Sequence, residues 1–142
     1  MFDIDGVLAD ASHRQHLLDG WGDWDRFFDA CGGDGLLSDQ AALTQALHHD
    51  WLVVLLTSRP MWVQFQTVGW LERYDAEIGW DLLIMRPDRD WRSSASFKRD
   101  EVRGLVAAGY EVRLTLDDDR RNVAAFRNEG LPCIYIHSGY HG

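Results

Sequence analysis

The chain has 142 residues, which suits one domain with a single core and is too short for two substantial domains. Its 46% hydrophobic residues and seven Trp exclude a disordered or fibrous protein, and its longest apolar run, residues 51–56, is far too short to span a membrane. The net charge of −9 argues against a protein that grips long nucleic acid, although residues 1–60 alone hold ten Asp and only three Arg.

The N-terminus and the cysteines indicate a reducing compartment. The first residues contain neither a basic segment nor an apolar stretch of the kind found in secretory signals, so we expect a cytoplasmic protein with no membrane contact. Cys31 and Cys133 are far apart and are not part of a CxxC or Cys/His motif. The sequence therefore predicts two reduced cysteines and no zinc site.

Apolar runs rich in β-branched residues alternate with segments of helical period, which predicts a parallel sheet flanked by helices. We expect strands at residues 1–3, 51–56, 82–85, 112–116 and 133–136. Only two residues precede Asp3, so the first strand is either unusually short or begins upstream.

Four helices are predicted between these strands. Their expected limits are Ser38 as N-cap to about His49, Pro60 in the first turn to about Tyr74, Ser96 as N-cap to Gly109, and about Arg121 to Glu129, closed by Gly130. Residues 20–35 are glycine-rich at both ends and carry Trp24, Phe27 and Phe28, which linkers rarely do. We therefore expect a small cap or lid over about residues 12–37.

Acidic and hydroxyl side chains follow three of the predicted strands. Asp3-Ile4-Asp5-Gly6 follows the first, Thr57-Ser58-Arg59 the second, and Asp117-Asp118-Asp119 a later one. The carboxyl ends of parallel strands meet at one edge, where ligands bind in open α/β sheets. The only lysine, Lys98, begins the helix that precedes the last acidic group.

This set resembles the haloacid dehalogenase (HAD) superfamily of phosphohydrolases, whose motifs are DxDG, Thr or Ser, Lys and an acidic pair. The order and coarse spacing match over the whole chain. The resemblance implies an α/β fold, a Rossmann-like three-layer sandwich with a central parallel sheet. It also implies a small cap insert after strand one, within a single domain spanning residues 1–142.

The resemblance assigns a role to each motif. Asp3 is the nucleophile that forms an aspartyl-phosphate, and Asp5 is the acid that protonates the leaving group and then activates water. Thr57 holds the phosphate, while Lys98 neutralises Asp3 and a phosphoryl oxygen. The expected cofactor is Mg²⁺, held by Asp3, the backbone carbonyl of Asp5, Asp117 and Asp118.

Within the superfamily, the chain is most similar to the phosphatase domain of polynucleotide kinase-phosphatases, which remove 3′-phosphates from nucleic-acid ends. The likeness rests on positions that imply substrate contacts, namely Arg14, Ser58, Arg59, Arg86 and Arg92. Two positions depart from that pattern: Ser94 replaces an acid, and Asp119 stands where that family has an Arg. The natural substrate therefore stays open between a nucleic-acid 3′-end and a mononucleotide, or another small phosphoester.

Other functions remain open from the sequence. No GK[ST] loop is present, so any kinase activity would belong to a partner domain or subunit. A signalling receiver uses similar residues but places its phosphorylated Asp after strand three, and an inactive interaction domain would not need every motif. Each motif also has a plainer interpretation: a turn at Asp5, a cap at Thr57, a solvated Lys98 or an acidic cap at residues 117–119. Trp24 and Trp91 are the tryptophans that we consider for base stacking.

Overall fold

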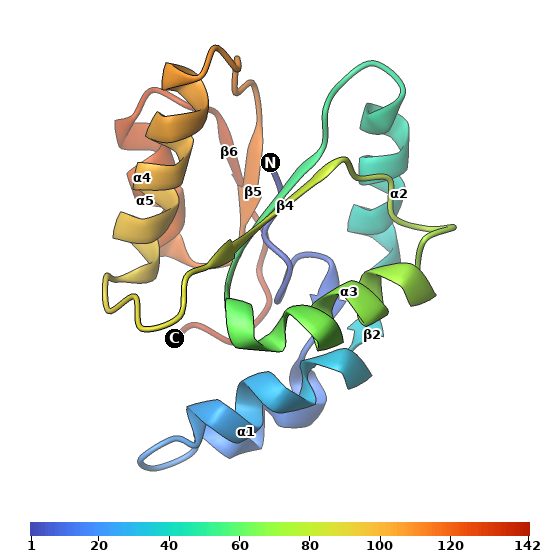
Figure 1. The fold of residues 1–142 in the computed structure, drawn as a ribbon, viewed down its shortest axis with the longest axis vertical. Helices are drawn as coiled ribbons and strands as arrows, with labels where there is room; N and C mark the ends of the chain where they lie inside the picture. The colour runs from blue at the N-terminus through green and yellow to red at the C-terminus, as the bar shows by residue number, and fades with distance from the viewer.

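The computed structural model describes residues 1–142, and a central parallel sheet lies between two layers of helices (Figure 1). The sheet contains β3 (Val54–Pro60), β4 (Leu82–Arg86), β5 (Thr115–Asp117) and β6 (Cys133–Tyr135). β3 pairs with β4, and β5 pairs with β6, in both cases parallel. This arrangement confirms the predicted α/β sandwich.

Residues 1–3 occupy the centre of this sheet, between β3 and β5. Phe2 forms parallel bridges to Leu55 and to Leu116. The amide of Phe2 donates to the carbonyl of Val54 at 2.8 Å, and the amide of Asp3 donates to Leu116 at 3.0 Å. The spatial order is therefore β4, β3, residues 1–3, β5 and β6, which places Asp3 at the middle of the sheet edge.

Two helices cover each face of the sheet (Figure 1). α2 (Ser38–His48) and α3 (Gln64–Arg73) share one core with the central segment, and Trp70 of α3 is fully buried there beside Leu55. α4 (Ser94–Ala107) and α5 (Arg120–Asn128) share the second core, which contains Leu56 and Phe126. Leu55 and Leu56 enter opposite cores because successive side chains of a strand point to opposite faces.

A small structure follows the central segment and lies beyond the carboxyl ends of the strands (Figure 1). It is bounded by β1 (Ala9–Asp10) and β2 (Gly35–Leu36), which pair antiparallel. Between them come a 3₁₀ helix (Ser12–Leu18), α1 (Trp24–Asp29) and a second 3₁₀ helix (Ala30–Gly33). We call residues 9–36 the cap. None of the helices of the structure has the length and apolar character that crossing a membrane requires.

Several predicted boundaries were wrong by a few residues. β3 begins at Val54 and continues to Pro60, which is extended and pairs with Arg86, so Pro60 ends a strand instead of starting a helix. A 3₁₀ helix (Met61–Val63) then precedes α3. β5 begins at Thr115 because its pairing with β6 starts at Cys133, which leaves residues 112–114 outside the strand.

Two helix caps also differ from the prediction. Ser93, not Ser96, caps α4, since its hydroxyl accepts a hydrogen bond from the Ser96 amide at 3.1 Å. Leu37 occupies the N-cap position of α2 without a side-chain bond, and Ser38 is already helical. In both places a serine lay near the start of the helix, but only the backbone conformation decides which residue is the cap.

Candidate active site

Asp3 lies at the carboxyl end of the central segment and contacts the only lysine of the chain. Lys98 reaches it from the first turns of α4, with its Nζ 3.0 Å from Asp3 Oδ1 and 2.6 Å from Asp117 Oδ2. The Lys98 side chain is 1% exposed. The structure therefore holds one ammonium group between two carboxylates that come from different strands.

Burial and charge shift the pKa values of this group in a consistent way. Burial raises the pKa of Asp3 well above its usual value, and the carboxylates of Asp117 and Asp118 add to this, while Lys98 opposes it. Burial by itself would lower the pKa of Lys98, but attraction to Asp117 and Asp3 outweighs burial and raises it. Lys98 is therefore a permanent cation at the site.

The carboxylates of Asp3, Asp117 and Asp118 form a compact acidic group, with one oxygen of each within 4.8 Å of the others. Asp117 Oδ1 accepts hydrogen bonds from the Asp119 amide at 2.9 Å and from Asn122 Nδ2 at 3.0 Å. Asp118 Oδ2 is buried and accepts no hydrogen bond of good geometry, and its one ion-pair contact, His141 Nε2, lies 3.4 Å away. A buried carboxylate oxygen held only by such a long contact fits a cation ligand, and an all-oxygen set suits Mg²⁺.

Gly6 makes room for this acidic group. Its φ of +77° lies in the left-handed region, and a Cβ at this position would lie 2.1 Å from Asp118 Oδ2. Only glycine therefore lets the DxDG turn approach the Asp118 carboxylate so closely. The backbone carbonyl of Asp5, in the same turn, accepts no backbone hydrogen bond, which leaves it available as the further ligand that the family resemblance implies.

Asp119 is not part of the acidic group. It is the N-cap of α5 and accepts a hydrogen bond from the Arg121 amide at 2.8 Å. The plainer interpretation of the acidic run thus holds for one of its three residues, while the other two face Asp3.

Asp5 contacts two buried arginines. Arg14 Nη2 donates to Asp5 Oδ1 at 2.6 Å, and Arg59 Nη2 donates to the same oxygen at 2.7 Å. Behind them Asp34, fully buried at the start of β2, accepts from both arginines at 2.7 and 2.9 Å. Burial would raise the pKa of Asp5, but the charges of Arg59 and Arg14 outweigh burial and lower it.

The structure places Arg14 and Arg59 behind Asp5, where both are at most 1% exposed. Sequence reasoning assigned them to substrate and missed Asp34, the second carboxylate that pairs with both of them. It also missed Asn122, which orients Asp117. Neither residue belongs to a motif that the sequence marked; an acid expected near two buried arginines would have been the only signal for Asp34.

The two hydroxyl groups in the carboxyl-terminal half of β3 differ in their surroundings. Thr57 is 1% exposed, and its Oγ1 accepts a hydrogen bond from the Arg59 amide at 3.1 Å. Ser58 Oγ lies 2.7 Å from Ser94 Oγ, so the serine that replaces the expected acid is hydrogen-bonded to a second hydroxyl.

A cleft of about 590 Å³ opens above these residues. Asp3, Asp5 and Asp118 line its floor, together with Ser58 and Arg86. Nε and Nη2 of Arg86 are buried and donate no hydrogen bond, and its guanidinium lies 5.3 Å from the centre of the Phe97 ring. Of the predicted substrate residues, Ser58 and Arg86 thus line the cleft. Arg92 does not, because Asp90 and Asp100 engage its guanidinium.

Comparison with known protein families shows where the chain belongs. Residues 1–141 match the family described as "Polynucleotide kinase PNKP phosphatase domain". The chain belongs to this family. It is thus a HAD-type phosphatase-family domain, of a superfamily that generally uses Mg²⁺, and it carries a buried Asp cluster.

Solved structures extend the likeness of this PNKP-family domain. It is similar to a chain in "Structure of the Pnkp1/Rnl/Hen1 RNA repair complex", with 26% identity and a TM-score of 0.77 over 95% of its length. A chain in "Structure of Pnkp1/Rnl/Hen1 complex" gives 27% identity and a TM-score of 0.78, also over 95%. The PNKP-family domain spans only 40% and 43% of those two chains. No curated protein matches it.

Proposed function

We propose that this chain is an Mg²⁺-dependent phosphomonoester hydrolase that acts through an aspartyl-phosphate on Asp3 and removes 3′-phosphates from nucleic-acid ends. The observation that carries the proposal is the position of Asp3. It lies on the floor of the cleft, 3.0 Å from the Lys98 cation and in one compact acidic group with Asp117 and Asp118. Phosphoryl transfer needs such a nucleophile together with nearby positive charge.

In the first step a carboxylate oxygen of Asp3 attacks phosphorus. A new bond forms from Asp3 to phosphorus, the bond from phosphorus to the 3′-oxygen breaks, and Asp5 donates a proton to the leaving oxygen. Lys98 lies beside Asp3 and Asp117 in the structure without substrate, so its charge is already in place for the phosphoryl group. Thr57 of β3 would fix the phosphoryl oxygens.

Asp3, Asp117, Asp118 and the Asp5 carbonyl would hold the Mg²⁺ ion. Bound there, the ion supplies positive charge that offsets the repulsion between the Asp3 carboxylate and an anionic substrate. The buried Asp118 Oδ2, which accepts no hydrogen bond of good geometry and has only the 3.4 Å contact with His141, supports this assignment.

In the second step water attacks phosphorus, the bond from phosphorus to Asp3 breaks, and Asp5 takes the proton from the water. Arg14 and Arg59 lower the pKa of Asp5 and so favour the carboxylate that this step requires. The protonated form needed in the first step is the minor form of Asp5 in the structure as it stands.

A nucleic-acid 3′-end is the substrate that we favour. The family is described by polynucleotide kinase PNKP, and aromatic and arginine side chains line the same cleft as Asp3. A mononucleotide is the second candidate, because the net charge of −9 leaves little basic surface for a long strand. We also propose that residues 1–142 act as one domain with the cap over its site, alongside a kinase domain or subunit.

The test is phosphate release from a 3′-phosphorylated oligonucleotide and from free 3′- and 5′-mononucleotides, each with Mg²⁺ or with EDTA. We expect release that requires Mg²⁺ and is fastest with the oligonucleotide. The Asp3→Asn variant should release no phosphate, because an amide cannot act as the nucleophile, and its circular dichroism spectrum should show that the fold is intact. Activity in Asp3→Asn, or in EDTA, would contradict the proposal, and preference for mononucleotides would make the protein a nucleotidase.

A further inference from the structure

The loop between β4 and α4, residues 87–93, forms one wall of the cleft and is held in place by its own side chains. Asp88 Oδ1 accepts a hydrogen bond from the Trp62 amide at 3.0 Å, which ties the loop to the segment after β3. Asp90 accepts from the amide of Arg92 at 3.0 Å, and Ser93 caps α4. The loop is therefore joined both to the segment after β3 and to the start of α4.

Two side chains of this loop are left without partners, and both line the cleft. Arg89 makes no hydrogen bond and no ion pair, whereas the guanidinium of Arg92 binds Asp90 and Asp100. Trp91 is 89% exposed and packs on no other aromatic ring. The loop thus presents one free cation and one free indole to whatever enters the cleft.

The backbone at Arg89 supports a role in binding. Its φ of 59° makes it the only residue other than glycine in the left-handed region. Such a conformation is costly for a long side chain, and strained residues of this kind cluster at binding and active sites. Here the conformation sets the direction of a guanidinium that has no structural partner.

We infer that residues 87–93 recognise the single-stranded nucleotide that precedes the 3′-terminal one, with Trp91 stacking on its base and Arg89 pairing with its phosphodiester. This inference rests on the proposed function and narrows its substrate to a polynucleotide end. Asp3 is on the floor and its side chain is 11% exposed, whereas Trp91 stands at the open rim. When a terminal phosphate lies at Asp3, the terminal nucleotide that carries it occupies the floor of the cleft. The side chains at the rim then contact the preceding nucleotide.

The cap contributes a second exposed tryptophan to the same cleft. Trp24 of the cap is 56% exposed, lines the cleft and packs against Phe28 with ring centres 5.8 Å apart. Aromatic side chains from the loop and from the cap, together with unpaired guanidinium groups, fit a ligand that alternates flat rings with phosphates. Every base has such a face, so stacking of this kind tolerates any sequence.

The test compares kcat/KM for a 3′-phosphorylated oligonucleotide with kcat/KM for a 3′-mononucleotide. Trp91→Ala should lower the ratio of the two values by about tenfold, the effect expected for one lost base stack. Arg89→Asn keeps a residue that tolerates the left-handed backbone but removes the charge. It should lower the same ratio and reduce the steepness of the log–log salt dependence of oligonucleotide binding by about 0.7.

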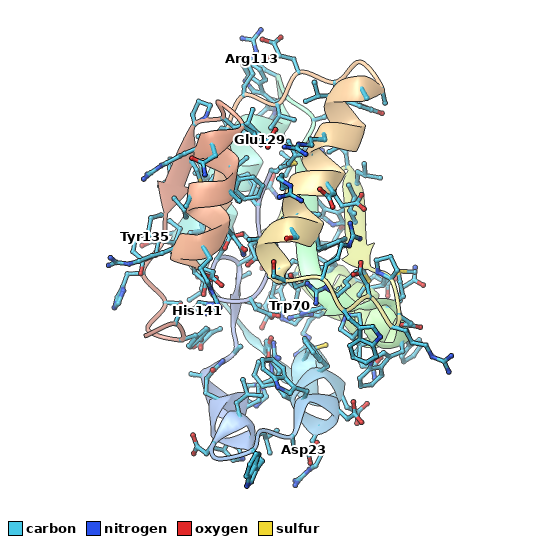
Figure 2. The ribbon with its side chains drawn as sticks, turned by 90° about the vertical axis from the view of Figure 1, so that its left-hand side faces the viewer. Asp23, Trp70, Arg113, Glu129, Tyr135 and His141 are labelled. Carbon is cyan, nitrogen blue, oxygen red and sulfur yellow. The ribbon has the colours of Figure 1, made fainter.

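An abasic nucleotide at the penultimate position sharpens the assay. Wild type should lose about tenfold on this substrate, and Trp91→Ala should lose nothing more, because the base that it stacks on is already missing. A matched control pair lies away from the cleft: the Arg113 guanidinium is 4.7 Å from the centre of the Trp51 ring. Figure 2 shows Arg113 far from His141, which lines the cleft, and Trp51→Ala and Arg113→Asn should leave the ratio unchanged.

Failure of the inference differs from failure of the proposed function. If Trp91→Ala lowers both kcat/KM values equally, or if the abasic substrate behaves like the normal one, the inference is overturned. If wild type releases no phosphate from any substrate, the proposed function fails instead. Anisotropy of a fluorescent 3′-phosphorylated single strand then decides the inference: about tenfold weaker binding by Trp91→Ala supports it, and equal binding overturns it.

Discussion

At the scale of single residues, the site depends on one ammonium group among several carboxylates. Lys98 is the only lysine and is buried between Asp3 and Asp117, with its Nζ at 3.0 and 2.6 Å from their oxygens. Buried charges are tolerated only when each has its partner, since removal from water is costly. Lys98 therefore has a structural task as well as the chemical one that we propose for it.

Lys98→Met should lower the free energy of unfolding by about 3–5 kcal/mol, because it leaves two carboxylates buried without a cation. The double variant Lys98→Met/Asp117→Asn should recover part of this loss, since one of the two charges is then removed. Urea unfolding of the three proteins, followed by circular dichroism, measures both effects. If Lys98→Met alone were as stable as wild type, Lys98 would not stabilise the fold.

At the scale of elements, the polar residues of the site lie at one sheet edge because strands from distant parts of the chain end there. Their apolar centres were predictable, since runs such as residues 54–56 and 133–136 read as buried strands. Their ends were not, because pairing of Pro60 with Arg86 depends on a neighbour far along the chain. The β1–β2 pair has two residues in each strand and left no periodic signal.

The candidate site was likewise predictable only where local sequence decides the position of a residue. The acidic motifs were predictable because each follows a strand, and the fold decides their common edge. The direction of Arg14 and Arg59 was not, since a spacing along the sequence does not say whether a guanidinium faces a substrate or a buried acid. That acid, Asp34, is brought to them only by the cap, through bonds to Arg14 and Arg59 at 2.7 and 2.9 Å.

Asp81 gives a pH-dependent test at the entry to β3 and β4. Its Oδ2 accepts a hydrogen bond from the Val53 amide at 2.7 Å, and Oδ1 lies 2.9 Å from His48 Nε2. The Val53 bond, more than the contact with His48, lowers the pKa of Asp81. Because the pKa of Asp81 is lower in the folded state, the carboxylate stabilises the fold at pH values above its unfolded-state pKa of about 3.9. This stabilisation is lost as the pH falls through the folded-state pKa.

Asp81→Asn should therefore cost about 1 kcal/mol at neutral pH and show a smaller fall in stability below about pH 4 than wild type does. Urea unfolding at a series of pH values measures this difference. Asp75→Asn, at an exposed position in the same connection, is the control and should follow wild type. Parallel acid curves for Asp81→Asn and wild type would contradict the role of the Val53 bond.

At the scale of the whole molecule, charge is distributed unevenly along the chain. The acidic excess lies in the first 60 residues, while eleven of the fourteen basic residues lie beyond them, including the arginines that line the cleft. The chain spans 40% and 43% of the two solved chains that it resembles. We therefore expect strong binding of long nucleic acid to need more than these 142 residues.

The most direct test of the account is to trap the phosphoryl group on Asp3. In Asp5→Asn, incubated with Mg²⁺ and p-nitrophenyl phosphate, the leaving group needs no protonation, but the water that should hydrolyse the intermediate has lost its base. Mass spectrometry of the acid-quenched protein should then find one phosphoryl group in the peptide that begins at Met1, and none in Asp3→Asn/Asp5→Asn. A phosphoryl group on another residue, or none in either protein, would contradict nucleophilic catalysis by Asp3.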